Sequence, residues 1–209
     1  MRLTLPKIYP ITDRQLSGLS HAEQVRRLIN GGATFVQLRE KHLPAIDFLR
    51  DAEAASKVAG THGVTLIIND RVDIAMASGA RGVHLGQDDM PVEAARRLLR
   101  DDALIGFSSH TQLQMEAAAR LPIDYVAFGP IFTTRTKQDR DPTVGLEQLR
   151  AARNIRADLP LVAIGGITPV NVQAVLEAGA DSVAVISSVV GEPAEIEQNM
   201  RRMLDLAGV

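Results

Sequence analysis

Two aspartates stand where paired carboxylates could hold a divalent cation. Asp70 and Asp89 each follow a short apolar run of strand length. If those runs are neighbouring strands, which lie about 5 Å apart in a sheet, both carboxylates can reach one ion. Two carboxylates completed by water and a substrate phosphate suit Mg²⁺. Either aspartate could instead cap the helix that follows it, and Asp88 competes with Asp89 for the role of ligand.

Three basic residues follow other apolar runs in the same way. Arg39, Lys41 and Lys137 would bring their positive charges to the edge that holds the aspartates. Clustered cations beside Mg²⁺ indicate a polyanionic substrate, and pyrophosphate is a natural candidate. The alternative for each lysine is an ordinary solvated surface charge. Thr134 and Thr136 lie with Lys137 in the polar stretch Thr133–Thr143 and would add hydroxyl groups.

The last two apolar runs end in small residues that suit a phosphate group. One is followed by Gly165-Gly166-Ile167, and the other ends at Ile186-Ser187-Ser188. Glycine lets the backbone approach a phosphate closely, and amide groups near a helix start can bind it. The alternative is a tight turn, which needs glycine anyway.

Other common chemistries find little support in the sequence. The chain has no cysteine, which excludes disulfides, thiolate metal sites and cysteine nucleophiles. His110 follows two serines and could cap a helix or act as a general base, whereas His84 lies inside an apolar run. No Ser-His-Asp order or paired-histidine spacing indicates triad hydrolysis or a histidine zinc site.

The elements that must position these residues form an alternating series. Eight apolar runs, nearly continuous as in strands buried on both faces, are separated by amphipathic segments. The runs are Ile8–Thr12, Thr34–Leu38, Val64–Ile68, Gly82–Leu85, Leu104–Phe107, Tyr125–Phe128, Leu161–Ile164 and Ser182–Ile186. The segments are Ser20–Asn30, Ala45–Ala59, Val72–Ser78, Val92–Arg100, Thr111–Arg120, Gly145–Arg156, Pro169–Glu177 and Pro193–Leu206.

Eight strands that are each followed by a helix predict an α/β fold, a single-domain (β/α)₈ TIM barrel over residues 1–209. A doubly wound open sheet is the structural alternative. In a barrel, residues at the carboxyl ends of the strands build the active site, so the polar strand ends fall on one face. A Gly-Ala-x-x-Val pattern at Gly32, Gly79 and Gly179 predicts left-handed glycines between a helix and the next strand.

Composition limits the partners. The chain has 209 residues and a formal net charge of −2, which disfavours a nucleic-acid or anionic-membrane surface. Five Phe, two Tyr and no Trp provide little base-stacking surface. No segment has the length of a signal peptide core or membrane span, so we expect a cytoplasmic location. Oligomeric state does not follow from the sequence.

Taken together, the strand ends resemble the thiamine phosphate synthase family over almost the whole chain. The matching stretches are Tyr9–Asp13, Gln37–Lys41, Asn69–Asp73, Gly82–Asp89, Gly129–Phe132, Thr134–Lys137 and Ala163–Ile167. The resemblance implies a (β/α)₈ barrel and a transferase of thiamine biosynthesis. Such an enzyme joins a hydroxymethylpyrimidine diphosphate to a thiazole phosphate and releases pyrophosphate.

The resemblance also implies the roles of individual residues. Mg²⁺ is the implied cofactor, with Asp70 rather than a helix cap and Asp89 rather than Asp88 as its ligands. The implied contacts to the pyrimidine diphosphate are Gln37, Leu38, Arg39, Glu40, Lys41, Asn69, Ser108 and Lys137. Those to the thiazole phosphate are Thr134, Arg135, Thr136, Gly166, Ile186 and Ser187.

The implied mechanism begins with ionisation of the pyrimidine diphosphate. Arg39, Lys41 and Lys137 are the expected catalytic residues, because they would stabilise the departing pyrophosphate. A thiazole tautomerase on the same barrel is one alternative, since it shares the Ser-x-His strand end at Ser108–His110. A non-catalytic barrel that binds a phosphate ligand is another.

Overall fold

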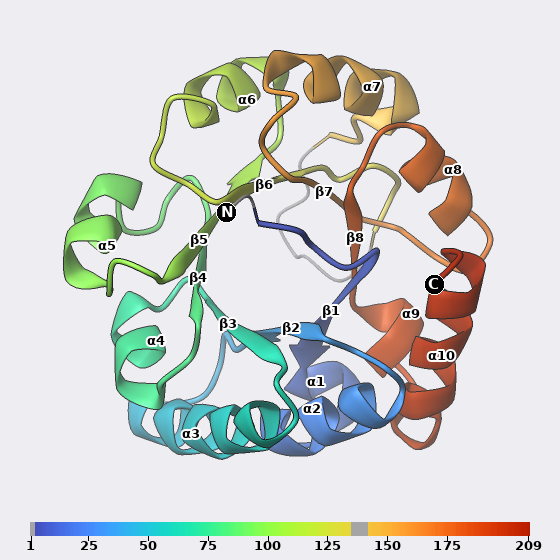
Figure 1. Ribbon diagram of the computed structural model, residues 1–209. Helices are drawn as coiled ribbons and strands as arrows, with labels where there is room; N and C mark the ends of the chain where they lie inside the picture. Colours follow the sequence, from blue (N-terminus) through green and yellow to red (C-terminus); the bar gives the residue numbers. More distant parts are fainter. Residues whose placement is uncertain (1–2, 135–141) are drawn as a thin grey trace.

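The chain folds into a closed barrel of eight parallel strands surrounded by helices (Figure 1). The computed structural model describes residues 3–134 and 142–209. Strand order around the barrel follows chain order, and β1 pairs with β8 at Ile8↔Val183, which closes the ring. The predicted (β/α)₈ fold is therefore confirmed, and the open sheet is excluded.

The eight strands coincide with the eight apolar runs, with shifts of one or two residues at their ends. They are β1 (Ile8–Asp13), β2 (Phe35–Arg39), β3 (Thr65–Asn69), β4 (Gly82–Leu85), β5 (Leu104–Ser109), β6 (Tyr125–Phe128), β7 (Leu161–Ile164) and β8 (Ser182–Val185). The extension of β5 places Ser108 and Ser109 inside the strand, where its hydrogen-bonded register fixes them.

The predicted amphipathic segments form helices on the outside of the barrel. These are α2 (His21–Asn30), α3 (Ala45–Thr61), α4 (Val72–Ser78), α5 (Val92–Leu98), α6 (Gln112–Ala118), α7 (Gly145–Ile155), α8 (Val172–Glu177) and, after the short turn η1 (Pro193–Glu195), α10 (Ile196–Leu206). Two four-residue helices, α1 (Arg14–Ser17) and α9 (Ser187–Val190), were not predicted, because one turn is too short to show helical periodicity.

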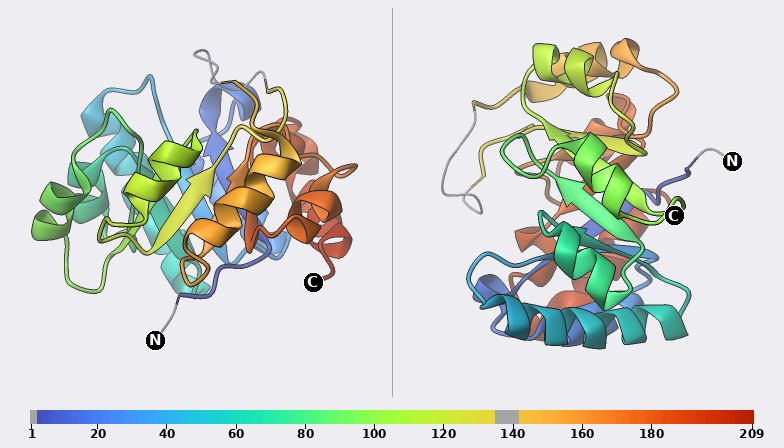
Figure 2. Two further views of the ribbon diagram at one scale, coloured as in Figure 1. Left: turned by 90° about the horizontal axis from the view of Figure 1, so that it is seen from above. Right: turned by 90° about the vertical axis from the view of Figure 1, so that its left-hand side faces the viewer.

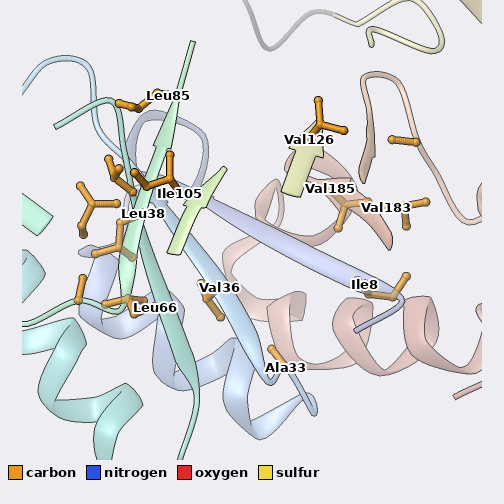
Figure 3. Close-up of a cluster of buried hydrophobic side chains, with 14 of the residues drawn as sticks. Ile8, Ala33, Val36, Leu38, Leu66, Leu85, Ile105, Val126, Val183 and Val185 are labelled. Atoms are coloured by element: carbon orange, nitrogen blue, oxygen red, sulfur yellow. The ribbon is translucent and has the colours of Figure 1, made fainter. Parts of the chain in front are cut away.

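Alternate residues of each strand point into and out of the barrel, and both faces are buried. Tyr9 and Ile11 belong to the inner cluster, whereas Ile8, between barrel and helices, belongs to the outer one. Figure 3 shows part of this outer layer, in which Val36 and Leu38 of β2 lie among buried side chains of other strands. Burial on both faces is why the strands are continuously apolar.

The two ends of the barrel differ. At the amino ends of the strands, Gly32, Gly79 and Gly179 have φ of 99°, 73° and 107°, so the predicted left-handed glycines are confirmed. Leu5, from the segment before β1, packs against the inner cluster, and this segment crosses the barrel end that faces the viewer in Figure 1.

The opposite end carries the polar loops that follow the strands; the two side views of Figure 2 separate the two ends. In the part of the chain that the structure describes, no helix has both the length and the apolar character needed to cross a membrane.

Candidate active site

A cavity of about 590 Å³ opens at the carboxyl ends of the strands. Its walls come from every part of the barrel, and they contain most of the predicted site residues. Those that line it are Gln37, Arg39, Lys41, Asn69, Asp70, Asp89, Ser108, Thr134, Gly166, Ile186 and Ser187. The closed barrel thus brings together predicted residues that lie up to 150 positions apart in the chain, from Gln37 to Ser187.

Two predicted residues do not reach the cavity with their side chains. Leu38 is wholly buried in the outer cluster, because alternation along β2 sends it outward while Gln37 and Arg39 point inward. Glu40 is also absent from the cavity wall. Arg135, Thr136 and Lys137 lie outside the described residues.

Asp70 occupies its position through an unusual backbone conformation. Its φ is 61°, and its amide donates to the carbonyl of His84 on the neighbouring strand at 2.8 Å. A left-handed conformation costs a residue with a β-carbon about 1 kcal/mol or more, and such strain is common at functional sites. The residue that caps α4 is Arg71, without a side-chain hydrogen bond, so Asp70 does not serve as the helix cap.

Asp89 closes a turn and faces the same cavity. Its Oδ2 accepts a hydrogen bond from the Gly86 amide at 2.6 Å, whereas α5 begins after Pro91 without a side-chain cap. Burial raises the pKa of Asp89; a hydrogen bond and like charge from Asp70 add to that rise, while Gly86 and Lys41 oppose it. Asp88, its neighbour, also lines the cavity but is more exposed.

The carboxylate pair fits a magnesium ion. Asp70 and Asp89 come from adjacent strand ends, and the like charge of Asp70 helps to raise the pKa of Asp89, a repulsion that a divalent cation would relieve. Lys41 forms an ion pair with Asp70 and supplies part of that compensation. Among the described residues there is no cluster of three or more metal-binding side chains. Mg²⁺ needs few protein ligands, because it keeps water and substrate phosphate in its shell.

The loop after β2 is held by a buried network. Arg39 pairs with Asp13 at 3.1 Å, and both residues lie at the carboxyl ends of paired strands. Glu40 turns away from the cavity and approaches His21 Nε2 at 3.3 Å. It also accepts hydrogen bonds from the amides of His42 and Leu43 at 2.7 and 3.1 Å. Glu40 thereby fixes the backbone on either side of Lys41.

These contacts set the charge of Glu40. Burial alone would raise the pKa of Glu40, but hydrogen bonds from His21, His42 and Leu43 outweigh it and lower the pKa to about 2. The folded-state value lies below the ordinary 4.5, so ionised Glu40 stabilises the fold above that pH. The stabilisation is lost as the pH falls from 4.5 towards 2.

We expect Glu40→Gln to lower the free energy of unfolding at neutral pH by about 1–2 kcal/mol, because solvent screens part of the charge interaction. The difference from the wild type should shrink at about pH 3. Urea unfolding at both pH values measures it. Glu53→Gln, on the exposed side of α3, is the matched control and should change little at either pH.

One wall of the cavity is polar and rests on His84, which has the hydrogen-bonded role expected of it inside its strand, and on Tyr125, which the sequence analysis did not single out. Ser108 Oγ lies 2.9 Å from His84 Nε2, and His84 Nδ1 lies 3.1 Å from the hydroxyl of Tyr125. Burial lowers the pKa of His84 to about 4, against the opposing charge of Asp89. A buried histidine or tyrosine inside an apolar strand gives no local signal of such a contact.

The opposite wall consists of small and apolar residues. Ala127, Val162 and Ala184, from β6, β7 and β8, line the cavity there. The loops that follow β7 and β8 are tied together, since Ser188 Oγ donates to the carbonyl of Ile167 at 2.6 Å. The cavity therefore offers a charged side and a side suited to an aromatic ring.

Gly166 has a structural reason to be glycine. Its φ is 65°, and a β-carbon there would lie 2.7 Å from both Phe132 Cβ and the Thr133 carbonyl oxygen. Asn171 Nδ2 donates to the Gly166 carbonyl at 3.1 Å and holds the same turn. The tight-turn explanation thus applies, and it also brings the Gly166 backbone to the cavity wall.

We expect Gly166→Ala to lower the free energy of unfolding by at least about 2 kcal/mol, because left-handed strain and a steric clash add. Gly63→Ala is the matched control: φ is 66° there, but a β-carbon would meet open space. That variant should lose only about 1 kcal/mol. Equal losses in thermal or urea unfolding would contradict the clash at Gly166.

His110 lines the cavity with a defined hydrogen-bond pattern. Its Nδ1 lies 2.7 Å from the Gly129 carbonyl, which can only accept, so Nδ1 carries the proton. The cap of α6 is Thr111, whose side chain accepts from the Gln114 amide, so His110 is not the cap.

Fold and cavity define the class of protein: a (β/α)₈ barrel whose charged cavity lies at the carboxyl ends of its strands. Residues 8–189 match the family described as thiamine monophosphate synthase. The chain belongs to this family.

Individual relatives agree over nearly the full chain. The thiamine-phosphate synthase of Albidiferax ferrireducens is 45% identical over 208 residues, which cover 98% of this chain and 94% of that protein. The one of Clostridium novyi is 46% identical, covering 88% and 90% of the two chains. A solved structure, thiamine phosphate pyrophosphorylase from Pyrococcus furiosus, superposes with a TM-score of 0.88 at 33% identity, covering 97% and 95%.

Proposed function

We propose that this protein is a thiamine phosphate synthase. It transfers the methylene group of a 4-amino-2-methylpyrimidine diphosphate to the nitrogen of a thiazole phosphate and releases pyrophosphate. The observation that carries the proposal is the cavity itself, which joins a carboxylate pair and two cations on one side to a glycine- and serine-rich edge on the other. The high identity to curated synthases over most of the chain supports the same activity.

The pyrimidine diphosphate would occupy the side formed by the ends of β2 to β5. Arg39 and Lys41 are already held at that edge by Asp13 and Asp70. Charge-assisted hydrogen bonds from both to phosphate oxygens would favour a diphosphate over a neutral group. The remaining polar residues proposed for this substrate are Gln37, Asn69, Ser108 and, from the undescribed segment, Lys137.

The thiazole phosphate would occupy the opposite side. Gly166 and Ser187 follow β7 and β8, where barrels often bind phosphate through backbone amides. In α9 the Val189 and Val190 amides already donate to the Ile186 carbonyl, so the Ser187 and Ser188 amides are the ones that would bind a ligand. Thr134 and Ile186 line the same side. Arg135 and Thr136 belong to the proposal but lie outside the described residues.

Asp70 and Asp89 are the proposed ligands of Mg²⁺, which when bound would neutralise charge on the diphosphate. The chain's own residues account for the other steps. Arg39, Lys41 and Lys137 would stabilise the leaving group while the carbon–oxygen bond breaks and its electron pair departs with pyrophosphate. The apolar wall around Ala127 would keep water from the methylene cation until the thiazole nitrogen attacks.

No protein nucleophile or strong base is required by this sequence of steps. A thiazole tautomerase would need a proton-transfer group such as His110 but no diphosphate site. It leaves the clustering of Asp70, Asp89, Lys41 and Arg39 unexplained. The cytoplasmic location and the small-molecule substrates expected from the sequence belong to the same proposal.

The test is incubation of the purified protein with both substrates and Mg²⁺, followed by chromatographic detection of thiamine phosphate and pyrophosphate. Product should depend on each substrate and disappear with excess chelator. Conversion of the thiazole phosphate between tautomers, without thiamine phosphate, would instead support the tautomerase. Binding without turnover would support a non-catalytic barrel.

A further inference from the structure

Five side chains form a continuous hydrogen-bond chain across the barrel interior. Gln37 Nε2 lies 2.8 Å from the Tyr9 hydroxyl, which lies 2.9 Å from that of Tyr125. The Tyr125 hydroxyl lies 3.1 Å from His84 Nδ1, and His84 Nε2 lies 2.9 Å from Ser108 Oγ. Both end residues, from β2 and β5, line the cavity. The three between them are at most 6% exposed: Tyr9 and His84 also border the cavity, and Tyr125 is wholly buried.

The barrel makes room for this chain at Gly106 of β5. A β-carbon there would lie 2.1 Å from Tyr125 Cζ and 2.4 Å from both the Tyr125 hydroxyl and His84 Nδ1. Gly106 pairs in register with both His84 and Tyr125. Any larger residue would occupy the space of the hydrogen bond between the two rings. The strand therefore has a gap where the chain passes.

Proton counting requires the hydrogen bonds of this series to run in one common direction, and the orientation of the Gln37 amide selects which of the two directions it is. Each hydroxyl has one proton, and a neutral imidazole donates from one nitrogen only. If the Gln37 amide nitrogen donates to Tyr9, the Tyr9 hydroxyl satisfies its own proton inside the barrel by donating to Tyr125, and Tyr125 then donates to His84 Nδ1. His84 Nε2 then donates to Ser108, whose own proton is left to donate into the cavity. If the Gln37 carbonyl faces Tyr9 instead, every hydrogen bond reverses, and Ser108 donates to His84 Nε2 rather than into the cavity.

We propose that Tyr9, Tyr125 and His84 are positioning residues that couple Gln37 to Ser108, so that the atom a substrate presents to Gln37 decides whether Ser108 donates. When Gln37 donates to Tyr9, its carbonyl oxygen is left for the cavity. A substrate with an amino group satisfies that oxygen and at the same time selects the Ser108 donor. A phosphate oxygen, which can only accept, then accepts a hydrogen bond from the Ser108 hydroxyl.

This inference rests on the proposed function and specifies its selectivity. A pyrimidine that carries an oxo group in place of the amine would favour the reversed amide of Gln37. Ser108 would then face the diphosphate with lone pairs alone. The enzyme would thus bind the oxo analogue less well at both Gln37 and Ser108, because the buried hydrogen bonds link the two residues. Removal of a buried hydrogen bond at a site built for it commonly produces such strong discrimination.

The direct test is nuclear magnetic resonance of ¹⁵N-histidine-labelled protein with the aminopyrimidine diphosphate and Mg²⁺, without the thiazole. His84→Asn serves only to identify the His84 signals. We expect His84 to be protonated at Nε2 and unprotonated at Nδ1 in this complex. The opposite tautomer, or an imidazolium, would overturn the proposal.

A second test measures coupling in binding. The quantity measured is the dissociation constant of the aminopyrimidine diphosphate with Mg²⁺. In the wild-type background, the effect of the double variant Gln37→Ala/Ser108→Ala should differ by at least about threefold from the product of the two single effects. With Tyr125→Phe, which keeps the ring and removes the hydroxyl, the two effects should multiply. In the wild type, the amino compound should bind at least about tenfold more tightly than the oxo analogue. In Tyr125→Phe, this preference should shrink to within about threefold.

Matched variants separate this coupling from general damage. Tyr9→Phe breaks the chain at another link and should reproduce the loss. Ser109→Ala removes a buried hydroxyl from β5, the strand of Ser108, but Ser109 is not part of the hydrogen-bonded series. This variant should keep the coupling. Unchanged coupling in Tyr125→Phe would overturn this proposal. The proposed function would stand as long as thiamine phosphate is still formed. Failure of the wild type to bind the diphosphate at all would instead contradict the proposed function.

Discussion

Asp89→Asn is expected to lower the rate of thiamine phosphate formation at least about 100-fold, while Asp88→Asn leaves it nearly unchanged. The two residues are adjacent and both line the cavity, but the Gly86 amide holds only the carboxylate of Asp89. Its carboxylate interacts directly with that of Asp70, so its removal breaks up the pair that would hold the cation. The exposed carboxylate of Asp88 provides a control of equal charge change.

Asparagine is the better replacement, because its carbonyl can still accept from Gly86 and keep the turn. Thermal unfolding should therefore change little, and the loss should appear in turnover and in the Mg²⁺ concentration needed for half-maximal activity. Inactivity of Asp88→Asn together with activity of Asp89→Asn would show that the metal ligand is the other aspartate.

Lys137→Ala is expected to lower the maximal rate at least about tenfold, a loss of roughly 1.4 kcal/mol or more in transition-state stabilisation. The sequence places Lys137 after β6, and in the proposed mechanism it acts on departing pyrophosphate. Its charge matters most as the carbon–oxygen bond breaks, so the maximal rate should fall more than the apparent affinity for the diphosphate. Steady-state kinetics with each substrate varied separately distinguishes the two effects.

His110→Ala is the companion to this variant. Carbon–nitrogen bond formation by ionisation requires no base of comparable strength, so this variant should keep most of the activity. A tautomerase would show the reverse pattern, with an inactive His110 variant and a fully active Lys137 variant. Measured together, the two substitutions decide between transfer and isomerisation.

The sequence alone predicts the barrel because its signals are local. Each strand is buried on both faces, and this makes runs such as Leu161–Ile164 continuously apolar, whatever their neighbours are. The left-handed glycines, including Gly79, are fixed by the turn that each helix must make before the next strand. Once the fold is known, polar residues that follow the strands fall on one face.

Alternation within a strand sorts those residues further. Gln37, Arg39 and Lys41 line the cavity, whereas the intervening Leu38 and Glu40 face other surroundings. The family resemblance treats Gln37–Lys41 as one continuous block, so it does not separate side chains that reach the cavity from those that support it. For Glu40 the supporting role depends on His21, a partner from α2.

Tertiary structure alone decided the contacts between distant residues. Spacing left Asp88 and Asp89 equivalent, and only the structure shows that the Gly86 amide donates to the carboxylate of Asp89. Tyr9 and Tyr125 lie 116 residues apart, yet closure of the barrel brings their hydroxyls within 2.9 Å. Side-chain periodicity records whether a residue is buried, because burial depends on the local element. It does not record which distant group a buried hydroxyl meets, since that depends on strand order and register, which exist only in the closed barrel.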